Sequence, residues 1–261
     1  MNLFNQKIHY LVPVFNRERF VEETLESIVN DIKDFRNKKI IVLDDGSSDK
    51  TLRRIQEYKI KHDLVYVEIH HQDNQGIVAA RNKLISLSSN DAWLYLIDSD
   101  DRNIPGRTAK VLEYMIKNEI NICGTFLQCF GLSDKLFTYP SDDYTLKKLS
   151  KYVSVFGNPS VTFSPGIKHL LNYKKLPEDF YLFKDLSRSD LKFGNVTEPL
   201  VEYRAHNQQI TLELSKFVDV NFFLKLFNLF FIMFNFKISS ADKFWFMKNY
   251  LALGKIKSYF S

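Results

Sequence analysis

Short apolar runs alternate with amphipathic stretches through the first 118 residues of the chain. Runs of β-prone residues predict four strands, at residues 8–14, 39–43, 64–69 and 92–97. The spacing of Val21, Leu25, Ile28 and Ile32 predicts a helix within 17–33. Further helices are predicted over a stretch that ends near residue 61 and over 76–87 and 106–118. This order predicts an α/β fold, with a parallel sheet and helices on both of its faces.

The regular alternation stops after residue 118, where the pattern predicts a mixture of strands and helices. Strand-like segments lie at 120–130, 136–140, 160–164 and 198–206. Helical segments lie at about 166–173 and 178–191. No linker, repeat or low-complexity segment precedes about residue 214, which predicts one domain over 1–214 followed by a tail at 215–261.

Composition and charge are ordinary for a globular protein. The chain has 261 residues, 45% hydrophobic and 26% charged, with a formal net charge of +5. Its two cysteines, Cys123 and Cys129, lie in an apolar strand-like run and are expected to be buried free thiols. The N-terminus lacks the apolar stretch of a signal peptide, so we expect a cytoplasmic protein. No nucleic-acid partner is expected.

Polar clusters follow three of the predicted strands. They are Phe15-Asn16-Arg17, Asp44-Asp45-Gly46-Ser47 and Asp98-Ser99-Asp100-Asp101. In open parallel sheets, ligands bind beyond the carboxyl ends of the strands, so these clusters mark the candidate site.

Asp98 and Asp100 are separated by one residue and point the same way in an extended chain. Two such carboxylates suit Mg²⁺ or Mn²⁺, which fill the rest of their coordination with water and phosphate oxygens. The alternative is a solvated acidic turn in which Asp101 caps the following helix.

Six segments follow one another in this order: "VPVFNRERFVEETLESI", "IIVLDDGSSDKT", "NQGIVAARN", "LIDSDD", "PEDFYLF" and "YRAHNQQIT". Together they resemble the inverting GT-A glycosyltransferases of family 2. The resemblance runs from about Ile8 to Thr211. It implies a GT-A fold with a mostly parallel central sheet and flanking helices, a nucleotide-binding half at about 1–101 and an acceptor half at 102–214.

The resemblance implies a role for each matching residue of the nucleotide-binding half. Pro13 and Phe15 would border the base, although core packing is an equal alternative for Phe15. Asp44 and Asp45 would hold the base and ribose, with Asp45 accepting from the uracil ring N–H. The alternative, which is compatible with this role, is a turn with Gly46 in which Ser47 or Ser48 caps the next helix. The remaining assignments are Gly76 for a tight loop and Arg81 for bracing the loop or binding the diphosphate, with a structural ion pair as the alternative for Arg81.

The resemblance also assigns the donor's phosphate end. Asp98 would face the ribose, Ser99 would belong to the donor-binding residues, and Asp100 would ligate an Mn²⁺ or Mg²⁺ ion that bridges the diphosphate. His206 would bind the metal or the leaving phosphate, and Arg204 would stabilise its charge.

Glu178 and Asp179 match the acidic pair of the family, in which Asp179 is the general base and Glu178 supports it or touches the acceptor. A sugar hydroxyl is a poor nucleophile, and a carboxylate within hydrogen-bond reach can take its proton. The alternative is helix N-capping, because acidic residues after Pro177 suit the first turn of a helix. The segment before Pro177 lacks the Gly-rich turn of the family, which leaves the acceptor geometry open.

Residues 215–261 leave the family pattern and are rich in Phe, with seven lysines against two aspartates. The uncharged run 226–236 is shorter than the roughly 20 residues that span a bilayer. We expect a pair of basic helices at the inner surface of the cytoplasmic membrane. The alternatives are packing on the catalytic domain and contact with a second subunit in a homodimer.

Together these features predict a metal-dependent inverting glycosyltransferase. It would move a sugar from a UDP-sugar to a glycan or lipid-linked glycan in bacterial surface-polysaccharide biosynthesis. A sugar nucleotidyltransferase would carry a Gly-rich phosphate loop near the N-terminus, which "VPVFNRERF" lacks. A non-catalytic glycan-binding protein would tolerate the loss of Asp100 or Asp179, and both are present.

Overall fold

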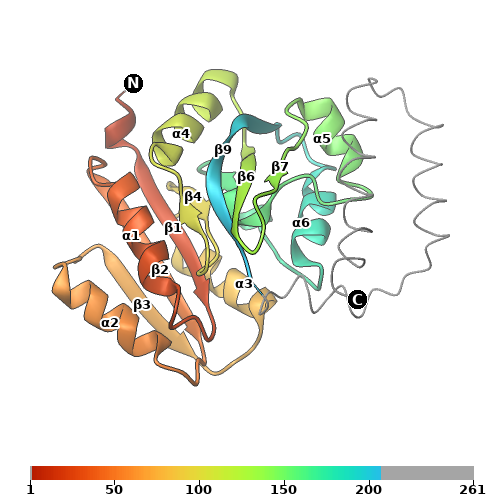
Figure 1. The fold of residues 1–261 in the computed structure, drawn as a ribbon. Coiled ribbons are helices and arrows are strands. Elements are labelled where there is room, and N and C mark those ends of the chain that lie inside the picture. The colour runs from red at the N-terminus through yellow and green to blue at the C-terminus, as the bar shows by residue number, and fades with distance from the viewer. Residues whose placement is uncertain (1, 207–261) are drawn as a thin grey trace. The chain divides into compact units, whose positions relative to one another are not determined.

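The computed structural model describes residues 2–206. A nine-stranded sheet runs through this part of the chain in the order β3-β2-β1-β4-β8-β6-β9-β5, with β7 paired to β6 (Figure 1). The first four strands of that order are parallel: β1 (Lys7–Val14), β2 (Asn37–Asp45), β3 (Val67–Gln72) and β4 (Trp93–Leu96). The α/β architecture predicted from the alternating pattern is therefore confirmed.

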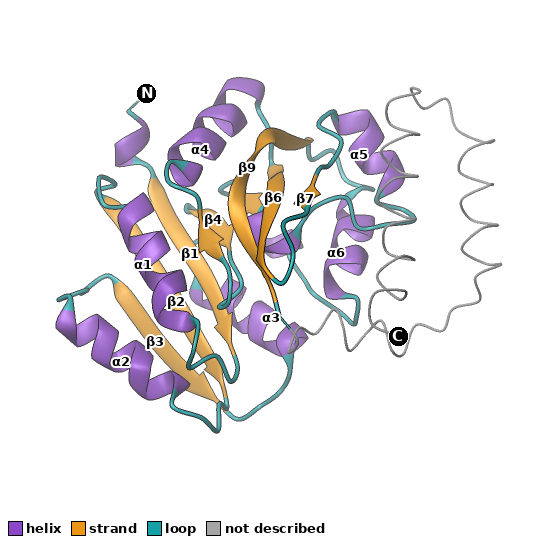
Figure 2. Cartoon of the chain, in the orientation of Figure 1, coloured by secondary structure: helices purple, strands orange, loops and turns teal. Residues whose placement is uncertain are grey.

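Helices cover both faces of the parallel strands, as Figure 2 shows for α1 and α2 on one side. The connecting helices are α1 (Val21–Asp31), α2 (Thr51–Lys61), α3 (Ile77–Leu87) and α4 (Arg107–Asn118). Tyr10 and Val12 belong to the core cluster that includes α1, α2 and α4. Leu11 points the opposite way, to the face where α3 contacts β1 and β2.

The second half of the described chain continues the sheet with antiparallel pairing. Its strands are β5 (Arg102–Asn103), β6 (Ile122–Gly131), β7 (Leu136–Phe137), β8 (Thr162–Phe163) and β9 (Phe193–Ala205). Its helices are α5 (Asp143–Leu149) and α6 (Glu178–Leu186). Short 3₁₀ turns lie at Leu3–Asn5, Asn158–Ser160 and Lys168–Leu170.

Several observed elements differ from the sequence expectations. The strand predicted at 64–69 is β3 at Val67–Gln72, because the chain first turns at Asp63 (φ 48°) and buries Leu64. The helix predicted at 166–173 is only a 3₁₀ turn, because the backbone of Tyr173 pairs with the side chain of Asn82. Helix α5 was not predicted, although Asp142 caps it by accepting from the Thr145 N–H at 2.8 Å.

Asp31, at the end of α1, fixes the start of α4. Its carboxylate accepts from the backbone N–H groups of Gly106 and Thr108 at 2.7 and 3.0 Å. Arg107, which is completely buried, donates to the carbonyl of Leu96 at 2.8 Å. These bonds hold the end of β4, and therefore the acidic residues that follow it, in one position.

Contacts divide the chain into two compact units. The first is Met1–Phe130 with Asp134–Arg204, and the second is Gly131–Ser133 with Ala205–Ser261. The predicted tail at 215–261 lies outside the described residues, and the domain division at 214 stays a prediction. Within residues 2–206 no helix is long and apolar enough to cross a bilayer.

Stability should fall in mild acid because of His9, which is 5% exposed in β1. Burial, aided by Lys39 and Lys7, lowers the pKa of His9 from 6.5 to about 4. The unfolded chain therefore takes up a proton before the folded chain does, and stability is lost as the pH falls from 6.5 towards 4. Thermal melts across this range should show a shallower decline for His9→Gln than for the wild type. Substitution of the exposed His169 by Gln is the control, and an unchanged decline in His9→Gln would contradict the assignment.

Candidate active site

The carboxyl ends of β1, β2 and β3 meet at one edge of the sheet. Val14 pairs with Asp44, and Asp45 pairs with Gln72. The predicted polar clusters that follow β1 and β2 are therefore neighbours in space, and the acidic cluster follows β4, which pairs with β1 on its other side. This is the edge where ligands bind in open α/β sheets.

The loop after β1 presents an exposed ring. Pro13 is buried inside β1, whereas Phe15 is 42% exposed. Core packing, one of the two expectations for Phe15, is therefore wrong. Asn16 has a φ of 51°, which directs the chain back over the edge of the sheet, and its side chain accepts from the N–H of Ser48 at 2.9 Å. Phe15 is left available for packing on a planar group.

Asp45 organises the loop that follows β3. Its Oδ1 accepts from Gln72 Nε2 at 2.7 Å and from the Gln75 N–H at 3.0 Å. Its Oδ2 accepts from the N–H of Gly76 at 2.8 Å. Gly76 has a φ of 82° and stands at the start of α3, a backbone conformation that favours glycine. Both oxygens of Asp45 are thus engaged in holding the loop.

The side chain of Asp44, at the end of β2, is completely buried. Its Oδ2 accepts from the Ser47 N–H at 3.3 Å and lies 2.8 Å from Nδ1 of His71. Its Oδ1 has no hydrogen-bond partner among residues 2–206. Buried polar atoms without partners are uncommon in proteins. Because Asp44 is completely buried, this oxygen does not face solvent, and the role predicted for Asp44 with the base or ribose stays a prediction.

Glycine is required at Gly46 for steric reasons. A Cβ there would lie 2.6 Å from the backbone nitrogen of Asn74, and its φ is 75°. The close approach brings the turn after β2 against the loop after β3, which Asp45 also braces.

Arg81 of α3 lies buried between the two acidic groups of the site. Its Nη2 donates to Asp98 Oδ1 at 2.8 Å and lies 3.6 Å from Glu178 Oε1. The guanidinium also lies 5.7 Å from the ring centre of Tyr173. Burial disfavours its charge, but Asp98, Tyr173 and Glu178 outweigh that effect and raise the pKa of Arg81. The structural ion pair expected as an alternative for Arg81 is present.

Asp98 and Asp100 differ in their partners at the end of β4. The Asp98 side chain is 29% exposed, and burial raises its pKa, with Arg81 opposing the rise and Asp100 adding to it. Oδ2 of Asp100 accepts from Arg17 Nε at 3.0 Å. Ser99 between them is buried. Asp100 is 9% exposed, so the expectation of a solvated acidic turn is wrong.

Asp101 has a structural position and does not cap the following helix. Its Oδ1 accepts from the backbone N–H of Arg204 in β9 at 2.8 Å. Burial, followed by repulsion from Asp100 and Asp98, raises its pKa well above the usual range. The next helix begins only at Arg107, and Asp31 from α1 takes the capping role there.

Arg204 is held on the edge of the site. Its Nε donates to the backbone carbonyl of Asp100 at 2.8 Å, and its Nη2 donates to Glu23 Oε2 at 2.6 Å. Its guanidinium lies 4.7 and 4.4 Å from the ring centres of Phe20 and Phe130. Stabilisation of the leaving phosphate by Arg204 stays a prediction. His206 belongs to the second compact unit, and its role as a metal ligand also stays a prediction.

Glu178 and Asp179 form the first turn of α6. Burial raises the pKa of Glu178, and Arg81 opposes the rise. Oδ2 of Asp179 accepts from Ser154 Oγ at 2.7 Å, and Oδ1 accepts from the Phe180 N–H at 2.7 Å. Neither contact excludes the predicted role as a base.

The segment before Pro177, which lacks the Gly-rich turn of the family, is anchored to helix α3 by hydrogen bonds. The Asn82 side chain exchanges two hydrogen bonds with the backbone of Tyr173, at 2.7 and 2.8 Å. Because Asn82 is next to Arg81, the same helix positions both the acidic pair of α6 and the segment before it.

Sequence reasoning missed three residues of the site: Arg17, His71 and Ser154. Arg17 belongs to a cluster that was recognised, but its target could not be inferred from the sequence. His71 is the last residue but one of β3, whose predicted bounds were too early. Ser154 lies in an irregular segment and carries no local signal.

A cation at this site would take few ligands from the described chain. Residues 2–206 contain no group of three or more His, Cys, Asp or Glu side chains that could hold a metal. Asp98 and Asp100 nevertheless fit Mg²⁺ or Mn²⁺, because these ions commonly use one or two carboxylates and fill the remaining positions with phosphate oxygens and water.

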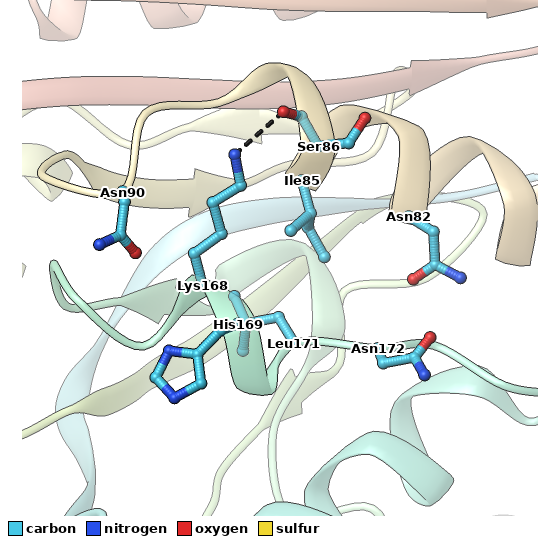
Figure 3. Close-up of a pocket in the computed structure, with 8 residues that line it drawn as sticks. All are labelled: Asn82, Ile85, Ser86, Asn90, Lys168, His169, Leu171 and Asn172. Atoms are coloured by element: carbon cyan, nitrogen blue, oxygen red, sulfur yellow. Dashed lines mark hydrogen bonds between the residues drawn. The ribbon is translucent and has the colours of Figure 1, made fainter.

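A cavity of about 560 Å³ lies outside this acidic site, between α3 and the 3₁₀ turn Lys168–Leu170 (Figure 3). Asn82, Ile85 and Asn172 are among its lining residues. Lys168 reaches across it to the carbonyl of Ser86 at 2.9 Å. Its polar groups therefore serve mainly to hold the chain together, and the acidic edge remains the candidate active site.

The fold and the acidic edge agree with a family of transferases. The model of the family "Glycosyl transferase family 2" matches residues 10–175. The chain therefore belongs to glycosyl transferase family 2.

Curated relatives are bacterial glycosyltransferases. "Glycosyltransferase GlyA" of Streptococcus pneumoniae is 29% identical over 60% of this chain and 22% of its own length. The "GalNAc(5)-diNAcBac-PP-undecaprenol beta-1,3-glucosyltransferase" of Campylobacter jejuni is 28% identical over 67% of this chain and 56% of its own length. The chain thus spans only part of the length of each of these relatives.

Solved structures share the fold at low sequence identity. TarS 1-349 of S. aureus, in complex with UDP-GlcNAc, has a TM-score of 0.62 at 16% identity and covers 96% of this chain and 73% of its own. The mannosyltransferase PcManGT of Pyrobaculum calidifontis, in complex with GDP-Man and Mn²⁺, has a TM-score of 0.63 at 12% identity. The match covers 81% of this chain and 61% of PcManGT. The GT-A fold is therefore confirmed.

Proposed function

We propose that the protein is an inverting glycosyltransferase that uses a UDP-sugar and a divalent cation. One observation carries this proposal. The same guanidinium nitrogen of Arg81 lies 2.8 Å from Asp98 and 3.6 Å from Glu178. Asp98, which is assigned to the donor, and Glu178, which is assigned to the acceptor, therefore border the same site. Transfer of a sugar requires the two substrates to meet in one site.

The donor would lie along the edge of the sheet. Phe15 offers an exposed ring for the base, and Asp44 and Asp45 lie beside it at the end of the neighbouring strand β2. Asp98 and Asp100 would hold Mn²⁺ or Mg²⁺, which when bound neutralises the developing charge of the departing diphosphate. The UDP-GlcNAc bound by TarS supports a UDP-sugar, and the Mn²⁺ bound by PcManGT supports the cation.

Asp179 would remove the proton of the attacking hydroxyl. The hydroxyl oxygen would form a bond to the anomeric carbon as the bond to the diphosphate breaks on the opposite face, which inverts the centre. Ser154 Oγ would orient the carboxylate through its 2.7 Å hydrogen bond to Oδ2. Glu178, paired with Arg81, would support Asp179 or touch the acceptor.

The acceptor is proposed to be a glycan or lipid-linked glycan of bacterial surface-polysaccharide biosynthesis. The undecaprenol-linked glycan in the name of the C. jejuni relative supports this class. The predicted contact of the tail with the inner membrane surface, and the alternative of a homodimer, concern residues outside the described part of the chain.

Substitution of Asp100 by Ala should abolish the dependence of UDP binding on the cation. Asp100 lies beyond the end of β4, and the variant loses the ion pair with Arg17, so a melting curve first checks that it is folded. Calorimetric titration of UDP with and without Mn²⁺ checks this, with Asp190→Ala, a change at an exposed carboxylate, as the control. Equal, still cation-dependent affinity in Asp100→Ala would count against the cation site. A parallel screen of UDP- and GDP-sugars for hydrolysis tests the class of donor.

A further inference from the structure

The guanidinium of Arg17 lies against the carboxylate that the proposed cation needs. Its Nε donates to Asp100 Oδ2 at 3.0 Å. Its Nη1 donates to the backbone carbonyls of Phe15 and Asn16, at 3.2 and 3.0 Å. The backbone N–H of Arg17 donates to Thr51 Oγ1 at 2.7 Å. These bonds hold the side chain on the loop after β1 and direct it at the end of β4.

This ion pair is unlike the pairs on the outside of the molecule. The side chains of Arg17 and Asp100 are 15% and 13% exposed, whereas those of Arg54 and Glu22 are each 46% exposed. Exposed pairs contribute little because water screens them. Partial burial strengthens the attraction between charges, so the pair of Arg17 with Asp100 should matter more.

Arg17 is also more accessible than the arginine that pairs with Asp98. The side chain of Arg81 is 5% exposed and belongs to the buried part of the site. Arg17 lies on the loop after β1, and its guanidinium contacts the backbone carbonyl of Phe15, a residue whose side chain is exposed. A cation that arrives from solvent can therefore take the place of the Arg17 guanidinium much more readily than that of Arg81.

We propose that Arg17 is the built-in counter-cation of Asp100, and that a divalent cation reaches Asp100 by displacing its guanidinium. This inference rests on the proposed function, because that function puts the cation on Asp98 and Asp100. Arg17 acts as a positioning residue: it compensates the carboxylate while the cation is absent, and it sets the concentration of cation that the site requires.

Displacement of the Arg17 guanidinium would make the binding of the cation depend on the binding of the nucleotide. A displaced guanidinium and a bound cation repel each other unless a negative group lies between them. The diphosphate of the donor supplies that group, and guanidinium binds phosphate oxygens well. Cation and nucleotide should therefore bind cooperatively in the wild type, and Arg17 should set the size of that coupling.

Direct measurement of Mn²⁺ binding to the full chain tests the proposal. The electron paramagnetic resonance signal of unbound Mn²⁺ gives its affinity with and without UDP. The wild type should bind Mn²⁺ weakly alone and more tightly with UDP. Arg17→Ala should bind Mn²⁺ alone roughly tenfold more tightly, within the ordinary range of coupling factors, and should gain less from UDP. Arg17→Lys keeps the charge and should stay near the wild type.

Thermal melts separate this role from a merely structural one. Without a divalent cation, Arg17→Ala should melt about 2–4 °C below the wild type, the shift that roughly 1 kcal/mol causes in a domain of this size. Added Mn²⁺ should restore the melting temperature, because it replaces the lost charge. If the bonds to the carbonyls of Phe15 and Asn16 were all that mattered, Mn²⁺ would not repair the loss. Arg54→Ala, at an exposed pair, should gain no more from Mn²⁺ than the wild type gains.

Each outcome decides the question. Equal affinity of the wild type and Arg17→Ala for Mn²⁺, or no binding of Mn²⁺ by either protein, overturns the role of Arg17. A melting loss that Mn²⁺ leaves unrepaired overturns it as well. Tighter Mn²⁺ binding in Arg17→Ala supports it. If that gain appears while neither protein binds UDP, the counter-cation role stands and the proposed donor is wrong.

Discussion

Asp179→Asn should abolish sugar transfer while UDP binding survives. The change keeps the size of the side chain and an oxygen that can accept from Ser154 Oγ, now at 2.7 Å. It removes the ability to take a proton from the acceptor hydroxyl, which typically costs a factor of about 10²–10⁴ in rate. Initial rates of transfer and calorimetric UDP affinity, measured on the same preparation, check the prediction.

The control for Asp179→Asn is Asp185→Asn in the same helix. Asp185 pairs with Lys174 at 2.7 Å on the surface, and its loss should leave transfer nearly unchanged. A near wild-type rate in Asp179→Asn would place the base elsewhere, with Glu178 the next residue to test. A loss of UDP binding together with transfer would show instead that Asp179 supports the fold or the nucleotide, as the helix-capping alternative expects.

Arg81→Met should destabilise the protein by roughly 3–5 kcal/mol, the usual cost of removing one partner of a buried ion pair. Arg81 is 5% exposed and compensates both Asp98 and Glu178. Methionine fills much of the space but leaves the two carboxylates without a counter-charge. Urea unfolding of the variant and the wild type measures the difference. Arg53→Met, at an exposed arginine, should cost little.

A second substitution tests the cause of that loss. In the Arg81→Met background, Glu178→Gln removes one of the uncompensated charges, so it should recover part of the lost stability. In the wild-type background the same change removes a partner of Arg81 and should not stabilise. The two effects differ in sign only if Arg81 and Glu178 interact, which is what a double-mutant cycle measures. Additive effects would contradict the coupling inferred from their 3.6 Å separation.

Local pattern was sufficient to predict the parallel half of the fold. The runs that became β1, β2 and β4 are continuous and apolar because strands covered on both faces must be apolar on both faces. The polar clusters that follow them were visible because each interrupts such a run abruptly. Prediction was weaker in the second half. The strands expected at 136–140 and 160–164 are present, but β7 and β8 are each only two residues long, so their predicted bounds were too wide.

Some signals were present in the sequence but were not used. Asp142 followed by an acidic residue has the composition of a helix start, and it caps α5 in the structure. The expected helix at 166–173 shows the opposite error, because tertiary hydrogen bonds to Asn82 determine the conformation near Tyr173. Local propensity is a weak prior when a distant side chain satisfies the backbone.

The sequence by itself determined the fold class, the family and the acidic residues at the edge of the sheet, because these follow from short-range patterns and ordered motifs. The tertiary structure decided how those acids are compensated. Arg17 and Asp100 are 83 positions apart, and Arg204 and Asp101 are 103 apart. Their meeting depends on the register of the sheet and on how the loops return across it. Spacing along the chain does not encode that convergence, so the counter-charges, unlike the carboxylates, could be assigned only from the folded chain.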